Sequence, residues 1–371
     1  MQPEHAIKQE ARHWAIEILD DLEDVLESTP RHEGSPGLED IQKTLLRLKA
    51  DFPKDNARLS DVSDLLFGAE IIAYGDRTTS VFTRWSEEKN GSPSLVAMLA
   101  QAADRLALTD DERMLRAAFV AAVLAECPNT LLYHGNEHYR KVVFHTIRML
   151  VTHMQMNFDI YPALDKTGML KMIISAIVHD LCHEGGDNLR DGIYTPGFME
   201  QRSFDIVRPY FESLGLDRDD WGDIETIVFC TDITFFAGDN SPCSRMKKIY
   251  GHFFGGGLPE GEDIGMMTVG KLRLFDENPK LALMAMMMHE ADIATSAGLS
   301  YEQSIIETIH FMEERDLKTA GPAVLLRFLT EQMDGRMMTP AAQALFGSQM
   351  AVIMQQAEDD LRRGCNTFYK D

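Results

Sequence analysis

The sequence has no apolar stretch long enough to cross a membrane as a helix. Such a span needs roughly 18 consecutive apolar residues, and the most apolar long run, Leu281 to Met288, is far shorter and fits a buried helix. The N-terminus carries Glu and His where a signal peptide would carry Lys or Arg and then an apolar run. The five cysteines form no Cys-x-x-Cys pair and are odd in number, which indicates reduced thiols. We therefore expect a protein of the cytoplasm without a membrane partner.

Positive charge is also scarce. The chain has 36 Lys and Arg against 59 Asp and Glu, so its formal net charge is −23. This charge repels a phosphate backbone and argues against duplex nucleic acid as a partner. A small anionic substrate would need a local cation, which a pair of metal ions would supply.

The period-two alternation of half-buried strands is missing, and the chain has no internal repeat. Apolar residues recur instead at helical spacing, and 44% apolar residues in a chain of 371 can build a sizeable core. We therefore predict an all-α fold with further helical segments from Ser60. The expected helices cover the ranges 4–28, 38–53, 109–126, 136–154, 168–180, 198–214, 221–236, 280–297, 301–316, 322–333 and 340–363.

The first two expected helices form a distinct N-terminal segment. Residues 29–37 hold two Pro and two Gly and separate the two helices, and we expect the second helix to stop near Pro53. We assign residues 1–58 to a helical N-terminal extension and residues 59–371 to the main domain. The extension could regulate the main domain, mediate a homodimer, or simply pack on the main body.

The central candidate site lies at the end of an apolar run. Ile173 to Val178 is followed by His179 and Asp180, and then by His183 and two Gly. At a helix end an adjacent His and Asp can turn toward one point, where they offer a nitrogen and a carboxylate to a metal. A carboxylate can also bridge two cations, so this stretch predicts a metal site that activates water.

Two further clusters carry candidate ligands. His134 and His138 are four residues apart, so a helix puts both on one face. This spacing suits two ligands, or one ligand beside a proton donor, although such histidine pairs also occur in purely structural roles. Asp292 follows a Met-rich apolar run, where an aspartate buried without a cation or another partner would be costly. We expect a fourth ligand at Asp292, with a helix cap as the alternative.

The order of these clusters resembles that of the HD metal-dependent phosphohydrolases. It reads His-x-x-x-His, roughly forty residues later His-Asp-x-x-His-x-x-x-x-Asn, and then a distant Asp. More narrowly, residues 60–365 resemble the catalytic domain of the class I cyclic nucleotide phosphodiesterases. The matching segments are Tyr133 to His138, His179 to Asn188, Glu200, Cys230 to Ile233, His289 to Ala294, and Ser348 to Val352.

The sequence also departs from the family pattern. Gly135 stands where the family has an Asn, and Arg202 and Ser203 stand where it has two His. Val352 replaces the Phe that forms one side of the family's aromatic clamp on the purine, and Val cannot stack as a ring does. The motifs therefore support divalent-metal chemistry more strongly than recognition of a purine.

The resemblance implies a compact multi-helix bundle with a metal site in a central pocket, so that residues 59–371 would be the catalytic domain. It implies one tightly held cation, which the donor types suggest is Zn, Fe or Mn. Its ligands would be His138, His179, Asp180 and Asp292. Asp180 would bridge to a second cation, Mg or Mn, and a hydroxide between the two would attack phosphorus.

The resemblance also implies roles around the two cations. His134 would protonate the leaving 3′ oxygen, and Glu200 or another carboxylate would hold its proton in place. The residues expected to orient the site are His183, Asn188, Glu200, Thr231 and Asp232. The residues expected to contact the substrate are Tyr133, Gln349 and Val352.

The implied reaction is hydrolysis of a 3′,5′-cyclic nucleotide, cAMP or cGMP, to the 5′-monophosphate. One alternative is an HD-type phosphohydrolase that acts on another nucleotide or phosphoester. The other is a non-catalytic module that binds a nucleotide or a metal. Two His and two Asp buried without a cation would be costly, which argues against the non-catalytic module.

Overall fold

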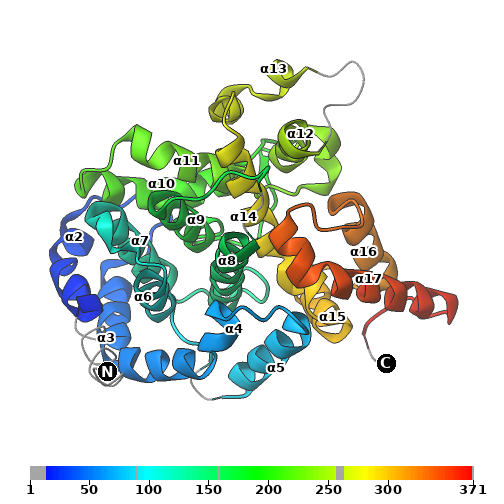
Figure 1. Cartoon of the computed structure of the whole chain (residues 1–371), viewed down its shortest axis with the longest axis horizontal. Coiled ribbons are helices and arrows are strands. Elements are labelled where there is room, and N and C mark those ends of the chain that lie inside the picture. The colour runs from blue at the N-terminus through cyan, green and yellow to red at the C-terminus, as the bar shows by residue number, and fades with distance from the viewer. Residues whose placement is uncertain (1–13, 89–90, 157–158, 256–262, 370–371) are drawn as a thin grey trace.

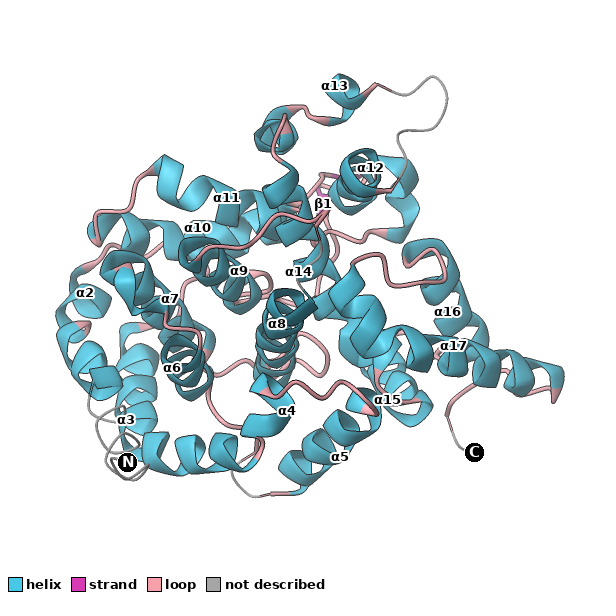
Figure 2. Cartoon of the chain, in the orientation of Figure 1, coloured by secondary structure: helices cyan, strands magenta, loops and turns pink. Residues whose placement is uncertain are grey.

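A computed structural model of the chain describes residues 14–88, 91–156, 159–255 and 263–369. Within these ranges helices dominate, and the strands amount to one antiparallel pair, β1 (Leu189–Arg190) and β2 (Ile193–Tyr194) (Figure 2). The all-α fold predicted from the sequence is confirmed.

The helices are numbered here as in Figure 1. They are α2 (Glu23–Ser28), α3 (Leu38–Asp61), α4 (Ser63–Phe67), α5 (Tyr74–Glu87), α6 (Leu95–Arg105), α7 (Glu112–Ala125), α8 (Asn136–Met156), α9 (Lys166–Val178), α10 (Phe198–Ser213), α11 (Arg218–Phe229), α12 (Pro242–Phe254), α13 (Ile264–Met267), α14 (Pro279–Gly298), α15 (Tyr301–Glu313), α16 (Pro322–Arg327) and α17 (Pro340–Arg362). Shorter helical turns are η1 (Leu108–Asp110), η2 (Phe235–Asn240), η3 (Gly270–Phe275) and η4 (Phe328–Gln332).

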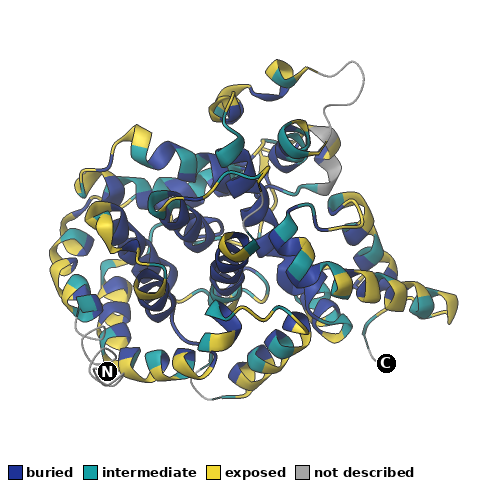
Figure 3. Ribbon diagram, viewed as in Figure 1, coloured by how far each residue is buried: buried dark blue, intermediate teal, exposed yellow. Residues whose placement is uncertain are grey.

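Helix α14 lies near the centre of the molecule, and its sequence explains why. Every residue from Leu281 to Gly298 is buried, so this helix must be surrounded by others (Figure 3). Asn278 begins the helix by accepting a hydrogen bond from the backbone N–H of Leu281 at 3.1 Å. Helices α8, α9, α12 and α17 pack around it. Neither α14 nor any other helix in the described ranges is both long and apolar enough to span a bilayer.

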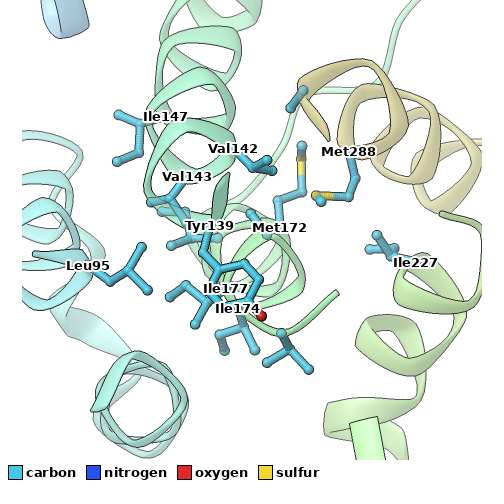
Figure 4. Close-up of a cluster of buried hydrophobic side chains, with 14 of the residues drawn as sticks. Leu95, Tyr139, Val142, Val143, Ile147, Met172, Ile174, Ile177, Ile227 and Met288 are labelled. Atoms are coloured by element: carbon cyan, nitrogen blue, oxygen red, sulfur yellow. The ribbon is translucent and has the colours of Figure 1, made fainter. Parts of the chain in front are cut away.

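The core between α8, α9 and α14 consists of aliphatic and methionine side chains. Figure 4 shows Val142 from α8, Met172 and Ile177 from α9, and Met288 from α14 in one cluster, and all four are fully buried. Close packing of this kind fixes the three helices relative to one another. It therefore also fixes the points at which polar side chains leave these helices.

Helix α9 ends where the central motif begins. Asp165 starts the helix by accepting a hydrogen bond from the backbone N–H of Gly168 at 2.7 Å. His179 is the C-cap residue and keeps helical backbone angles, whereas Cys182 has a φ of 56°, in the left-handed region that non-glycine residues rarely adopt. The chain therefore turns away just after Asp180, which leaves His179 and Asp180 at the edge of the core.

The expected helix end near Pro53 is wrong. Helix α3 continues through Pro53, because Leu48, Phe52 and Leu59 lie on a buried face, and the helix packs on α6 and α7. Proline removes one helical hydrogen bond, and this packing outweighs the loss. The suggested boundary between residues 58 and 59 falls inside α3, and the division into two domains stays a prediction.

The expected helix over 221–236 is also wrong in extent, because α11 ends at Phe229. Oδ1 of Asp232 accepts hydrogen bonds from the backbone N–H of Thr234 at 3.0 Å and from its hydroxyl at 2.6 Å. Such a local turn competes with the helix and ends it. Helix α12 is absent from the sequence-based expectations, although Ser241 caps it and Pro242 occupies its first turn, a pairing typical of helix starts.

Candidate metal centre and adjoining cavity

Four candidate ligands from three helices meet at one point. His138 lies in the first turn of α8, His179 and Asp180 lie at the end of α9, and Asp292 lies within α14. One ligand atom of each residue lies within 4.8 Å of the ligand atoms of the other three. The structure thus brings together the whole set that the sequence motifs suggest as the tight metal site.

The separations within this group suit a single small cation. Nε2 of His138 lies 3.1 Å from Oδ1 of Asp292 and 3.4 Å from Oδ2 of Asp180. It also lies 3.1 Å from Nε2 of His179, which is 3.2 Å from Oδ2 of Asp180. Ligands bound about 2.1 Å from a tetrahedral ion lie about 3.4 Å apart. The four side chains therefore fit one divalent ion with little rearrangement, and mixed imidazole and carboxylate donors suit Zn, Fe or Mn.

Local contacts orient these ligands toward the cluster. Nδ1–H of His179 donates to the carbonyl oxygen of Ala176 at 2.9 Å, which leaves Nε2 to face the carboxylates. Burial lowers the pKa of His179, but Asp180 and Asp292 outweigh it and hold that pKa well above its usual value. The same two carboxylates raise the pKa of His138 against its burial. A divalent cation would displace these protons, because it would bind the same ring nitrogens and would replace the protons as the positive charge beside the carboxylates.

A second group of candidate ligands shares Asp180 with the first. Ligand atoms of His134, Asp180 and His183 lie within 4.8 Å of one another, and Nε2 of His134 is 4.0 Å from Oδ2 of Asp180. The rings of His134 and His183 stack with their centroids 4.0 Å apart. Burial and the neighbouring His134 lower the pKa of His183 to about 4, so its ring is neutral near pH 7. Asp180 therefore lies where one carboxylate can serve two cations.

A carboxylate that the motifs do not identify holds His134. Nδ1 of His134 is in short contact with Oε1 of Glu314, and the backbone N–H groups of Tyr133 and His134 donate to Oε2 at 2.9 and 3.0 Å. Burial would raise the pKa of Glu314, but these contacts lower it to about 2. Sequence reasoning allows for Glu200 or another carboxylate in this position, and the structure has Glu314 there.

Glu200 lies instead in the cavity wall next to Asn188. Its Oε1 accepts a hydrogen bond from Nδ2 of Asn188 at 3.3 Å, and its buried Oε2 has no partner among the described residues. Burial and the nearby Asp232 and Asp180 hold the pKa of Glu200 well above its usual value. An unpaired buried oxygen beside the cluster indicates that the site is completed by a bound group with hydrogen-bond donors or positive charge.

Thr231 and Asp232 support the loop behind this wall. The hydroxyl of Thr231 donates to the carbonyl oxygen of Val228 at 2.8 Å. Oδ2 of Asp232 accepts hydrogen bonds from the hydroxyl of Tyr194 and the backbone N–H of Gly197, each at 2.8 Å. Both oxygens of Asp232 are therefore engaged by the protein, which favours a role in shaping the loop.

A cavity of about 470 Å³ opens beside both groups, within the size range of small-ligand sites. Tyr133, His134, Asp180, Glu200 and Asp292 line its polar side. Other walls come from α15, α16, the segment between them and the start of η4. They carry Phe311, Met312, Arg315, Leu317, Leu325 and Phe328. The motifs predict none of these six residues. In the sequence they show only ordinary helical spacing, so no local signal identifies them.

Gln349 and Val352, which we expected to contact the substrate, do not line this cavity. Nε2 of Gln349 donates to Oδ1 of Asp76 at 2.9 Å, outside the cavity wall, and Val352 is 49% exposed. Phe346 lies three residues before Gln349 and is buried on the same side of α17. Near Gln349 this side meets α5, which carries Asp76, so the aromatic surface of the cavity comes from other helices.

No protein-family model and no curated protein matches the chain. Among solved structures the chain is similar to "Structure of LmjPDEB1 in complex with IBMX", a Leishmania phosphodiesterase. The similarity has a TM-score of 0.46 at 12% sequence identity, and it covers 84% of this chain and 98% of that chain. The function of this chain must therefore be argued from the residues of its own site.

Proposed function

We propose that this protein is a metal-dependent phosphodiesterase that hydrolyses a 3′,5′-cyclic nucleotide to the 5′-monophosphate. The observation that carries the proposal is the convergence of His138, His179, Asp180 and Asp292 within 4.8 Å. The two aspartates of this group also line a ligand-sized cavity. His134 lies beside this group, 4.0 Å from the shared carboxylate of Asp180.

The four ligands supply what phosphoester hydrolysis needs first. A divalent cation held there lowers the pKa of water and neutralises charge on a phosphoryl oxygen. His179 and Asp180 would hold their positions through the fixed end of α9, and the hydrogen bond from Nδ1 of His179 to Ala176 would keep Nε2 available. The second group, with His183 and Asp180, offers ligands for a second cation such as Mg or Mn.

His134 would act as the general acid. Glu314 engages Nδ1 of its ring, so Nε2 is the nitrogen that can carry a proton toward the substrate. Stacking on His183 and the contact with Glu314 fix the plane of the ring. In this role His134 would protonate the 3′ oxygen as it leaves phosphorus, and Glu200, with its unpaired oxygen, would orient water in the same cavity.

The cavity also suits a small anionic ligand with an aromatic part. The chain as a whole carries −23, yet Arg315 and Arg327 both line this cavity. The guanidinium of Arg315 lies 3.7 Å from the centre of the Phe311 ring. These two arginines would attract an anionic phosphate, and the aromatic part of the lining would suit a base.

A second candidate function is hydrolysis of a different phosphoester by an HD-type phosphohydrolase. It is favoured by the position of Gln349 and Val352, which lie outside the cavity wall and so cannot supply the purine contacts that the motifs imply. Nucleoside monophosphates are the natural competitors to test, because their phosphate would meet the same ligands.

The test uses the full-length protein, stripped of metal and then supplied with Zn, Mn or Mg. We expect chelator-sensitive hydrolysis of cAMP or cGMP and of the base-free ester bis(4-nitrophenyl) phosphate. Turnover of nucleoside monophosphates but not of cyclic nucleotides would establish the second candidate. Absence of hydrolysis with every metal and substrate would refute both and leave a non-catalytic module.

A further inference from the structure

Glu307 is a buried carboxylate that the proposed reaction does not use. It lies on α15, is 4% exposed, and lines the cavity beside the metal cluster. Its Oε1 accepts two hydrogen bonds, from Nζ of Lys141 at 2.8 Å and from Nε2 of Gln303 at 2.6 Å. Burial would raise the pKa of Glu307, but Lys141 lowers it, so the group stays charged near pH 7.

The second oxygen of Glu307 accepts no hydrogen bond from the described residues. Protein atoms do not enclose this oxygen, Oε2, completely. It therefore keeps access to the cavity that Glu307 lines. A charged acceptor in a largely apolar wall costs free energy unless a donor reaches it. This oxygen is thus available to a ligand.

The neighbours of Glu307 suit a flat heterocycle. Tyr133 and Phe311 line the same cavity, with their ring centroids 5.3 Å apart. Ser296 also lines it, and its hydroxyl lies 3.4 Å from the hydroxyl of Tyr133. The two rings meet edge to face, so a base entering this part of the cavity would have aromatic carbon beside it and a carboxylate at its edge.

The chemistry of that oxygen distinguishes the two purines. Guanine presents two adjacent donors, N1–H and the 2-amino group, and one carboxylate oxygen can accept from both. Adenine presents a single amino group flanked by the ring acceptors N1 and N7, which a carboxylate repels. Base discrimination of this kind amounts to roughly 1–3 kcal/mol for a well-formed pair of hydrogen bonds, or about 5- to 150-fold.

We propose that Glu307 is a specificity determinant that makes guanine the preferred base, so that cyclic GMP is the better cyclic nucleotide substrate. This inference rests on the proposed phosphodiesterase function and adds the substrate class. It predicts a ratio of kcat/KM for cGMP over cAMP of about 10 or more in the wild-type protein.

The decisive variant is Glu307→Gln in the full-length chain. Lys141 and Gln303 donate to Oε1, so the amide oxygen should keep that position and the amide NH2 should replace Oε2. A donor then faces the cavity where an acceptor was, which should lower the cGMP over cAMP ratio by at least 10-fold and favour adenine. The matched control is Glu302→Gln, an exposed acid in the first turn of the same helix, which should leave the ratio unchanged.

The outcomes separate this inference from the function on which it rests. Chelator-sensitive hydrolysis with equal kcat/KM for both nucleotides in the wild type overturns the inference alone, and so does an equal loss on both in Glu307→Gln. If no phosphoester is hydrolysed, the proposed function fails. Titration of the wild-type protein with 5′-GMP and 5′-AMP then still decides the role of Glu307, because tighter binding of 5′-GMP supports it and equal binding refutes it.

Discussion

Replacing Asp292 by Asn is the most direct perturbation of the candidate metal centre. Asn keeps the volume and one oxygen, but it removes a charge that lies 3.1 Å from Nε2 of His138 and 3.4 Å from Nε2 of His179. Residues that merely orient metal ligands change metal affinity by about 10- to 100-fold when mutated. Loss of a ligand itself should therefore weaken binding by more than about 100-fold, or about 3 kcal/mol.

The same loss has a second readout in thermal stability. A cation present at about 100 times its Kd stabilises the folded chain by about 2.7 kcal/mol, so a chelator should lower the Tm of the wild type. When the Kd rises more than about 100-fold, that stabilisation disappears at the same metal concentration. Asp292→Asn should therefore melt at nearly the same temperature with and without a chelator.

The measurements are metal content per chain by mass spectrometry after dialysis and melting curves with and without a chelator. Asp223→Asn is the control. It removes a half-buried ion pair with Lys171, at 2.8 Å, and leaves the metal cluster unchanged. Full metal content in Asp292→Asn would show that Asp292 is not a ligand. Equal metal loss in both variants would point to damage to the fold, and the ligand assignment would then lack support.

Three further predictions concern the proposed general acid His134, the buried carboxylate of Glu126 and the turn at Gly197. His134→Ala should keep its metal but lose roughly 10²- to 10⁴-fold in kcat on a cyclic nucleotide. An activated nitrophenyl ester should be affected far less, and equal damage on both substrates would contradict the acid role. Burial would raise the pKa of Glu126, but Arg140 and a second arginine lower it from 4.5 to about 2. This depressed pKa contributes about 3 kcal/mol of stability above pH 4.5, and that contribution is lost as pH falls toward 2. In urea unfolding, Glu126→Gln should therefore destabilise by about 3 kcal/mol at pH 7 and by less below pH 4.5, and a pH-independent effect would rule out this account. Gly197 has a φ of 61°, and a Cβ there would lie 2.2 Å from the ring of Phe229, so Gly197→Ala should cost about 2–4 kcal/mol in the same assay. An unchanged free energy of unfolding would show that the turn can relax.

The helical class follows from local sequence, whereas the set of four metal ligands follows from the resemblance of the motifs to the phosphodiesterase family. The apolar run Leu281 to Met288 comes shortly before Asp292, and the run Ile173 to Val178 ends at His179 and Asp180, so these polar groups leave buried helices at defined points. Burial of α9 and α14 in one core then brings those points together. Local spacing alone does not select Asp292 over the equally buried His289 and Glu290 on the same helix, and the resemblance made that choice.

Glu307 and Glu314 could not be identified in this way. Both lie at or just beyond α15, and their partners are Lys141 and His134, far away in sequence. Neither residue differs in local pattern from the exposed Glu302 and Glu313 on the same helix. Only the packing of α15 against the start of α8 distinguishes them, and the sequence carries no short-range signal for that contact.

For helix α17 the motif was clear in the sequence, but the sequence did not show how the helix is oriented in the fold. The sequence Ser-Gln-x-x-Val suggested Gln349 at the substrate, yet the helix buries Leu345, Phe346 and Met350. Gln349 lies three and four residues after Phe346 and Leu345, so it shares their side of the helix, and its partner is Asp76 of α5. The contact between α17 and α5 therefore decides what Gln349 meets, and the motif carries no signal for that contact.

The position of His134 bears on how the two groups of ligands divide their roles. A ligand to a second cation and a proton donor would both use Nε2, because Nδ1 is engaged by Glu314, so His134 cannot serve in both roles at once. Glu314 stays charged at every working pH, since its pKa is lowered to about 2, and it engages Nδ1 of His134, so the proposed acid role would use Nε2. A second cation would then depend on Asp180 and on the neutral ring of His183, whose Nδ1 accepts a hydrogen bond from the backbone N–H of Gly185 at 2.9 Å.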